Sequence, residues 1–248
     1  MVQSLERAFA ILDEVAHRPA GVTAIAERVR LPKSTVARLL ATLEEVDAVE
    51  RFDGSRWRIG PGVEALTASA SPERSLVSAA RPVLVDLVAE LGEDAGLGLP
   101  DGNEIRYVDQ VESDNPVQVR DWTGTRAPLH AVPSGLVLLA EWPVDALTAY
   151  LAGGLVALTR RTVTDADELR ARLAEVREAG HAWGLEEFAE GIDSVAAPVR
   201  DARGNAIAAI HVHGPSYRFP APRSERRVAA AVKTAAEAVS RRLADDAR

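Results

Sequence analysis

The stretch Leu31-Pro32-Lys33-Ser34-Thr35-Val36-Ala37-Arg38-Leu39-Leu40-Ala41-Thr42-Leu43 decides the fold of the first part of this 248-residue sequence. Its large apolar residues recur at i, i+3, i+4 and i+7, which is the spacing of one helical face. They are Val36, Leu39, Leu40 and Leu43. The pattern predicts a helix over about residues 33–45. Its opposite face carries Lys33, Ser34, Thr35, Arg38 and Thr42.

Two helices and a hairpin surround this helix. An apolar stripe of Leu5, Phe9, Leu12 and Ala16 predicts a helix over residues 4–17, and Pro19-Ala20-Gly21 breaks it. Thr23 is the expected N-cap of a short helix over residues 23–30, with Glu27 near the capping-box position. Residues 49–52 and 56–59 flank Asp53-Gly54 and predict a β-hairpin. This order of elements is typical of a winged helix-turn-helix.

The polar face of the 33–45 helix suits DNA. A helix N-terminus attracts phosphate, and Ser, Thr and Arg side chains bind phosphates and base edges. Residues 28–43 contain four basic residues and no acidic one, and the hairpin adds Arg51, Arg56 and Arg58 against Asp53. Solvated helix faces carry similar charges, and helix-turn-helix segments also occur in proteins that bind no DNA, so both interpretations stay open at this point.

The second part of the sequence alternates between helices and strands. Helices are expected near residues 75–91, 134–141, 145–151, 165–179 and 223–244, and strands near 95–99, 104–111, 117–122, 194–200 and 206–214. Hairpin turns at Asp101-Gly102 and Arg203-Gly204 favour an antiparallel α+β domain over a doubly wound parallel sheet. Residues 67–72 are small and polar, end in proline, and suggest a linker.

Composition limits the classes of protein. The net charge is −8, with −1 over residues 1–68 and −7 over the remainder, which disfavours non-specific nucleic-acid binding by the whole chain. The sequence has no cysteine, which excludes disulfides and thiolate metal sites. It has no apolar run long enough to span a membrane and no secretory signal pattern. We therefore expect a cytoplasmic protein that does not associate with membranes.

Signatures of catalysis are weak. The sequence has no Gly-x-Ser-x-Gly, P-loop, Rossmann or His-Glu-x-x-His motif, so we expect neither an enzyme nor a bound cofactor. Glu186-Glu187 with Glu190 resembles paired carboxylates, and Ser134 follows His130 by four residues. A hydrolase that uses His130 and the Glu186–Glu187 region is the alternative from another class.

Three histidines are candidates for ligand binding. His211 and His213 lie two residues apart in an expected strand, so they share one face about 7 Å apart. With His130 they would make a metal site if the three converge, or they would hold an anion through N–H donors. Solvent-facing or separately satisfied imidazoles are the simpler alternative. We expect no metal, and a metal-responsive regulator is the second alternative.

Several motifs in order resemble the IclR (isocitrate lyase regulator) family of bacterial transcription regulators. In the first part these are residues 3–8 with Ile11-Leu12, residues 31–40, and Trp57-Arg58-Ile59-Gly60. In the second part they are residues 124–131 with Ser134-Gly135 and Leu139-Ala140, and residues 191–199 with Gly204, Ala208-Ala209 and Gly214-Pro215. The resemblance covers essentially the whole chain.

The resemblance implies a winged helix-turn-helix DNA-binding domain at residues 1–68, a linker helix at 69–92 and a GAF-like α/β effector-binding domain at 93–248. It implies a homodimer or homotetramer on double-stranded operator DNA and a small-molecule effector. The DNA-binding residues would be Thr23, Lys33, Ser34, Thr35, Arg38, Arg56 and Arg58. The effector-binding residues would be Val119, Ala127, Leu129, Pro133, Ser134, Ile192, Ser194, His211 and His213.

The sequence departs from the family pattern at the expected effector site. His211 and His213 stand where small or hydroxyl residues are usual, Leu136 replaces a common lysine, and Gly184-Leu185 lack an acid that often precedes the Glu pair. Two imidazoles gained and a carboxylate lost favour an acidic ligand. We therefore expect an organic acid as effector, with an aromatic one favoured by Trp122 and Trp183.

Overall fold

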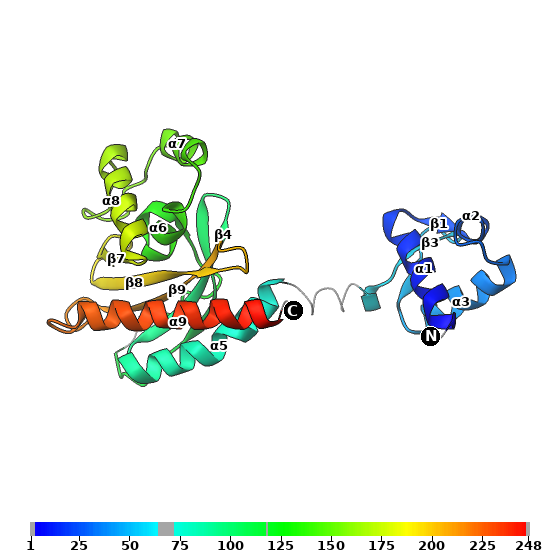
Figure 1. The fold of residues 1–248 in the computed structure, drawn as a ribbon, viewed down its shortest axis with the longest axis horizontal. Coiled ribbons are helices and arrows are strands. Elements are labelled where there is room, and N and C mark those ends of the chain that lie inside the picture. Colours follow the sequence, from blue (N-terminus) through cyan, green and yellow to red (C-terminus); the bar gives the residue numbers. More distant parts are fainter. Residues whose placement is uncertain (1–2, 64–71, 118, 247–248) are drawn as a thin grey trace. The chain divides into compact units, whose positions relative to one another are not determined.

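The structure of the chain, a computed structural model, describes residues 3–63, 72–117 and 119–246 (Figure 1). The chain divides into two compact units, Met1–Arg74 and Ser75–Arg248. The expected linker at residues 67–72 lies outside the described residues except for Pro72, which begins a helix.

The first unit is a small helical domain with a three-stranded antiparallel sheet in the order β1-β3-β2. Its elements are α1 (Gln3–His17), β1 (Ala20–Gly21), α2 (Val22–Arg28), α3 (Lys33–Glu45), β2 (Val49–Arg51) and β3 (Arg56–Ile59). The core contains Ile11, Val15, Ile25, Val36, Leu40 and Trp57. The predicted winged helix-turn-helix is therefore confirmed, with α3 at the predicted residues.

Two local predictions in this unit are wrong. Thr23 does not cap α2, because Gly21 occupies the N-cap position and no side chain bonds to the helix start. Ala20 and Gly21 not only end the first helix but also pair with β3 as a short strand. This pairing fixes the position at which α2 begins. On α1, Leu5 and Phe9 are 57% and 67% exposed, since the buried face is rotated toward Ile11 and Val15.

The second unit contains one six-stranded sheet in the order β6-β5-β4-β9-β8-β7. Every neighbouring pair is antiparallel, which confirms the predicted α+β class. Its strands are β4 (Asp94–Asp101), β5 (Glu104–Val111), β6 (Arg126–Pro128), β7 (Ala182–Leu185), β8 (Ile192–Arg200) and β9 (Ala206–Pro215). Its helices are α5 (Pro72–Leu91), whose first three residues precede the unit boundary, η1 (Leu129–Ala131), α6 (Pro133–Leu139), α7 (Val144–Ala152), α8 (Ala166–Ala179) and α9 (Glu225–Asp246).

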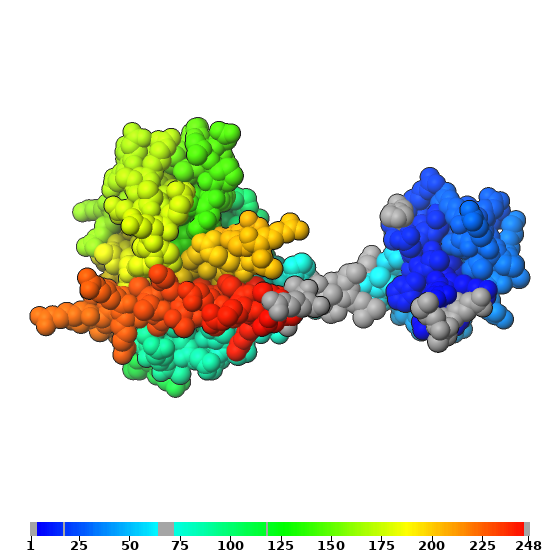
Figure 2. Space-filling model, viewed as in Figure 1, coloured from blue at the N-terminus to red at the C-terminus, as the bar shows by residue number. Residues whose placement is uncertain are grey.

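Helices cover both faces of this sheet. The helices α5 and α9 lie along one face, and α6, α7 and α8 lie on the other (Figure 1). Alternate residues of β9 divide between the two layers, with Ile210 and Val212 buried under α5 and α9 and Ala209 buried on the α6 side. In the space-filling view, α9 and α5 together form the side of the unit opposite α8 (Figure 2).

The expected strand at residues 117–122 is wrong. The described residues of this segment form no strand, and the chain joins the sheet at Gly124 and Thr125, which exchange backbone hydrogen bonds with Tyr107 just before β6. The segment instead brings Trp122 into a buried position against the α6 side of the sheet. Asp165 caps α8, accepting hydrogen bonds from the backbone N–H groups of Asp167 and Glu168.

None of the helices among residues 3–63, 72–117 and 119–246 is both long enough and apolar enough to cross a membrane.

Candidate functional site

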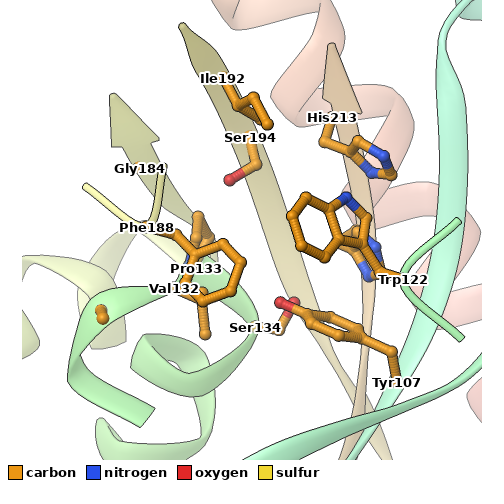
Figure 3. Close-up of a pocket in the computed structure, with 12 residues that line it drawn as sticks. Tyr107, Trp122, Val132, Pro133, Ser134, Gly184, Phe188, Ile192, Ser194 and His213 are labelled. Atoms are coloured by element: carbon orange, nitrogen blue, oxygen red, sulfur yellow. The ribbon is translucent and has the colours of Figure 1, made fainter. Parts of the chain in front are cut away.

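A small closed cavity lies in the second unit between the sheet and the start of α6 (Figure 3). Its volume is about 30 Å³, which is room for a water molecule or two. It is lined by Tyr107, Trp122, Ala131, Val132, Pro133, Ser134, Gly184, Phe188, Ile192, Ser194, His211 and His213. Side chains from β5, β8 and β9 therefore meet those of the α6 helix at one place.

His211 and His213 form the polar floor of this cavity. Both point from β9 to the α6 side of the sheet, and their rings stack with centroids 5.4 Å apart. The ring of His211 also contacts Tyr107, with centroids 4.8 Å apart. The neighbouring strand makes room for His211 because its register partner is Gly96, which has no side chain.

Three of the four ring nitrogens of the pair have no hydrogen-bond partner in the part of the chain that the structure describes. Nδ1 of His211 and both ring nitrogens of His213 are buried and unpartnered. Burial, followed by the neighbouring His213, lowers the pKa of His211 well below its usual range. Burial also lowers the pKa of His213 to about 4, although Asp94 and Asp121 act in the opposite direction. Both rings are therefore neutral near pH 7, and unpartnered polar atoms in such a place are ready to bind a ligand.

Hydroxyl groups complete the polar lining. The Ser134 side chain hydrogen-bonds to the Tyr107 phenol, and Ser194 on β8 is the register partner of His213. Burial raises the pKa of Tyr107, so the phenol stays neutral. Figure 3 shows Tyr107 and Ser134 at one end of the cavity, Ser194 at the other, and Phe188 facing Trp122 across it. The site combines neutral hydrogen-bonding groups with aromatic walls.

The two aromatic walls differ in how they are held. The backbone carbonyls just before Phe188 accept hydrogen bonds at 2.7 Å from the Thr159 and Thr162 hydroxyls. Glu187 also receives two hydrogen bonds from Arg172, at 2.6 and 2.7 Å.

Trp122 on the opposite side is held less firmly. Its backbone N–H donates to the Gln110 side chain at 3.2 Å, and its carbonyl accepts a local turn bond from the Thr125 N–H at 2.8 Å. Its ring contacts the edge of Phe188 and carries the Arg120 guanidinium on one face. Trp122 is thus the wall with the weaker support.

The structure brings six of the nine residues expected at the effector site to this cavity: Pro133, Ser134, Ile192, Ser194, His211 and His213. Ala127 and Leu129 are instead fully buried in the core on the α6 side of the sheet, and Val119 packs against that core. Of the two tryptophans, Trp122 lines the cavity, whereas Trp183 packs against Phe219 with centroids 5.9 Å apart.

Sequence reasoning missed two aromatic residues of the lining, Tyr107 and Phe188. A period of two along β5 places Tyr107 on the same face as Ile105, and this signal was available in the sequence. Phe188 lies in the irregular turn after the Glu pair, where no periodicity indicates the direction of a side chain.

The structure does not assemble the alternative sites. His130 lies apart from the pair and is bonded through its ring to the Tyr150 hydroxyl at 2.7 Å and to the Val156 carbonyl at 3.0 Å. Within the part of the chain that the structure describes, no three His, Asp or Glu side chains are placed to hold a metal ion. Glu186 pairs with Arg161 and Glu187 with Arg172, so neither is aligned with His130.

In the first unit, the polar face of α3 is open to solvent. Lys33, Ser34 and Arg38 are exposed, Thr35 is half-buried, and Thr23 is exposed in the first turn of α2. No acidic residue lies in the first turn of α3, and no side chain caps it. The helix start therefore offers free N–H groups and positive charge for a phosphate.

The arginines of the hairpin are neutralised by nearby acids. Arg56 bonds to Asp53 at 2.7 Å, and Arg58 bonds to Glu50 at 2.6 Å. Hydrogen bonds from Arg56 lower the pKa of Asp53 to about 2, so this acid stays ionised. Arg56 and Arg58 both stack on Phe52. The hairpin therefore presents less net positive charge than its arginines alone suggest.

A winged helix-turn-helix with an open basic helix start, followed by an antiparallel domain with a small cavity lined by aromatic and unpartnered polar groups, is typical of ligand-responsive DNA-binding regulators. Comparison with known proteins gives the particular family. The chain matches the IclR helix-turn-helix domain over residues 4–52 and the bacterial transcriptional regulator IclR C-terminal domain over residues 68–241. The chain belongs to the IclR family of transcriptional regulators, which are not enzymes.

Individual relatives agree with this assignment. The chain is 35% identical over 217 residues to the probable transcriptional regulator SauR of Cupriavidus necator, covering 86% of each protein. It is 28% identical to the crystal structure of Thermotoga maritima IclR, with a TM-score of 0.64, covering 98% of this chain and 99% of that one.

One solved relative contains a ligand. An IclR homologue from Microbacterium hydrocarbonoxydans in complex with 4-hydroxybenzoate is 24% identical, with a TM-score of 0.65, covering 97% of this chain and 99% of that one. At this identity the likeness shows the shared fold.

Proposed function

We propose that this regulator binds operator DNA through α3 and that a small organic carboxylate in the cavity of its second unit changes its affinity for the operator. The observation that carries the proposal is the stacked pair His211 and His213, three of whose ring nitrogens are buried with no hydrogen-bond partner among the described residues. Unpaired buried polar atoms are unfavourable, and a ligand carboxylate would satisfy them. The aromatic lining favours an acid with an apolar body.

An organic acid needs more space than the cavity of about 30 Å³ provides. Trp122 is the wall that would move, because its backbone is held by one bond to the Gln110 side chain and one local turn bond from the Thr125 N–H. The turn before Phe188 is instead fixed by Thr159, Thr162 and Arg172. Effector binding therefore displaces Trp122, and tryptophan fluorescence reports it. An effector that binds one conformation better changes operator affinity by a certain factor. By thermodynamic linkage, the operator changes effector affinity by the same factor.

The DNA half of the proposal is tested by fluorescence anisotropy on DNA upstream of the chain's own gene, across a salt series and against scrambled DNA. Sequence-dependent binding is expected. If a genome-wide selection with the purified protein also returned no preferred sequence, operator binding would be rejected.

The effector half is tested by titrating the protein with benzoate, 4-hydroxybenzoate, phenylacetate, glyoxylate and succinate. The 4-hydroxybenzoate is included because a relative's crystal structure contains it. At least one acid should change both tryptophan emission and operator affinity. The variant His211→Asn/His213→Asn should lose this response, and His181→Asn, a half-buried histidine outside the cavity, should keep it. Binding of the acid that is unchanged in the double variant would contradict the proposal.

We further propose that the regulator acts in the cytoplasm as a homodimer or homotetramer. The exposed Leu5 and Phe9 side chains on α1 support self-association, because a large apolar pair gains stability when it is covered. Sedimentation of the chain and of Leu5→Ser/Phe9→Ser tests this. If both proteins sediment with the mass of the same oligomer, the subunit contact does not involve Leu5 and Phe9. If the unmodified chain is a monomer at micromolar concentration, the proposed oligomer is rejected.

A further inference from the structure

The charges around the effector cavity point to an acid that binds together with a proton. We propose that this regulator takes up one proton for each carboxylate effector it binds, and that the stacked pair His211 and His213 receives it. The inference rests on the proposed carboxylate effector. It adds that the regulator responds jointly to the acid and to pH.

The first argument is the absence of a permanent cation. Among the twelve residues that line the cavity, all of them described, none is lysine or arginine. The nearest guanidinium along the segment, that of Arg120, stacks on Trp122, and Arg120 is exposed. A carboxylate moved into this niche would lose its hydration without gaining a positive charge from the protein.

The second argument is the sign of the charges behind the imidazoles. Asp94 on β4 lies with Oδ2 at 4.0 Å from Nε2 of His213, and it also accepts a hydrogen bond from the Ser113 backbone at 2.7 Å. Asp121, from the segment before β6, also interacts with His213. An incoming carboxylate would therefore be placed near existing acids if both imidazoles stayed neutral.

The remaining neighbours of the pair do not supply a charge. Tyr107 on β5 is a neutral phenol, and β8 and α6 contribute Ser194 and Ser134. Among the lining residues, the two imidazoles are thus the groups that can gain a positive charge when a carboxylate binds beside them.

A proton resolves this conflict. One imidazolium between the ligand carboxylate and Asp94 attracts both acids, and each charge is then paired. In the balanced reaction, the free protein with two neutral imidazoles combines with one carboxylate anion, RCOO⁻, and one proton from solvent. The product is a complex that contains one imidazolium, one neutral imidazole and the bound carboxylate. The geometry supports a single proton, because two charged rings with centroids 5.4 Å apart would repel each other.

The expected result is a dissociation constant that depends on pH. With neutral histidines in the free protein and one imidazolium in the complex, affinity for the acid falls by about tenfold per pH unit as pH rises from the ring pKa of the free protein to the raised ring pKa of the complex, a window that includes pH 7.5. The primary amide of the same acid has the same shape and no charge. Its binding should take up no proton and should not change with pH.

Calorimetric titration of the full-length protein in Hepes and in Tris at pH 7.5 measures the proton directly, because the two buffers differ in ionisation enthalpy. The ligands are the tightest-binding acid of the panel above and its amide. Uptake of about one proton is expected for the acid, following from the linkage above. His211→Gln and His213→Gln identify the acceptor, and His181→Gln is the control.

A second measurement avoids substitution. The ¹⁵N shifts of the histidine rings in the wild-type protein should show both rings neutral at pH 7.5 and one ring cationic after the acid is added. This remains decisive if a variant fails to fold.

The outcomes separate the two proposals. Binding of the acid with no proton uptake and a flat pH profile would overturn this inference and leave the effector proposal standing. Uptake that persists in the double variant His211→Gln/His213→Gln would overturn the assignment to the pair. Failure of every acid to bind would show already in the first titration and would overturn the effector proposal together with this one.

Discussion

The imidazole of His211 lies over Gly96, in the space that a side chain on β4 would occupy. The two residues are register partners on adjacent strands, and a Cβ atom at Gly96 would lie 2.5 Å from Cε1 of His211. The backbone of Gly96 needs no special conformation there; only the absence of a side chain matters. The cavity floor therefore depends on a residue that does not itself line the cavity.

Gly96→Ala should displace His211 and damage the cavity. Overpacking of a filled interior typically destabilises a protein by about 1–3 kcal/mol. We expect a loss of that size in urea unfolding and a weaker response of operator binding to the acid. Gly153→Ala is the matched control, because Gly153 lies at a helix end with the nearest atom, the Tyr150 carbonyl oxygen, at 3.3 Å. Equal effects of the two substitutions would contradict the role of Gly96.

The buried imidazoles should make the protein less stable in mild acid. The pKa of each ring is lower in the folded chain than in the unfolded one, so below pH 6.5 the unfolded chain binds protons that the folded chain does not. Stability then falls as pH decreases from about 6.5 toward 4, on the order of 1 kcal/mol per pH unit for a ring that stays neutral in the folded chain. Urea unfolding at several pH values measures this.

The comparison variant for that experiment is His211→Asn/His213→Asn, which should show a shallower loss between pH 6.5 and 4.5. Trp57→Phe in both proteins restricts the fluorescence signal to the tryptophans of the second unit. Parallel pH profiles would mean that other groups account for the acid sensitivity.

Two basic residues of α3 should contribute differently to DNA binding. Arg38 lies on the exposed face of the helix, so Arg38→Ala should reduce operator affinity by about 1–3 kcal/mol and relax sequence preference. Lys33 lies at the helix start, so Lys33→Ala should weaken operator and scrambled DNA alike and lower the salt slope by about one. Arg170→Ala, on α8 of the second unit, controls for loss of charge. Identical salt and sequence profiles for Arg38→Ala and Lys33→Ala would remove this distinction.

Asp53→Asn should strengthen DNA binding. The substitution frees Arg56 of its ion pair, while Oδ1 of asparagine still accepts the turn hydrogen bonds from Ser55 and Arg56. Because the released charge meets phosphate, affinity should rise by similar factors for operator and scrambled DNA, with a salt slope steeper by about one. The measurement is anisotropy at three salt concentrations. A gain limited to the operator would instead indicate base recognition by the hairpin.

Much of the first unit follows from periodicity. The apolar spacing of Val36, Leu39, Leu40 and Leu43 predicted α3 with its bounds, because a helix of this length repeats its signal over three turns. The stripe on α1 was misplaced by a rotation, since Leu5 and Phe9 are as apolar as Ile11 and Val15. Periodicity alone does not distinguish a face that meets the core from one left open.

The lining residues of the cavity were predictable where they belong to a regular strand. A period of two placed His211 and His213 together on one face, and the pair does stack there. Trp122 and Phe188 come from irregular segments whose path depends on contacts distant in sequence, such as Arg172 with Glu187. The Glu pair that resembled catalytic carboxylates is part of this scaffold: Glu187 fixes the turn that carries Phe188.

The unequal support of the two aromatic walls has a kinetic consequence. If Trp122 must swing aside before any acid fits, the rate of arrival is set by that motion and is nearly the same for different acids. The acids then differ in their dissociation rates, because the contacts with the Phe188 wall and the imidazoles determine how long each acid stays bound. A regulator built this way measures an effector by its residence time, and brief pulses of a weakly held acid leave the promoter unchanged.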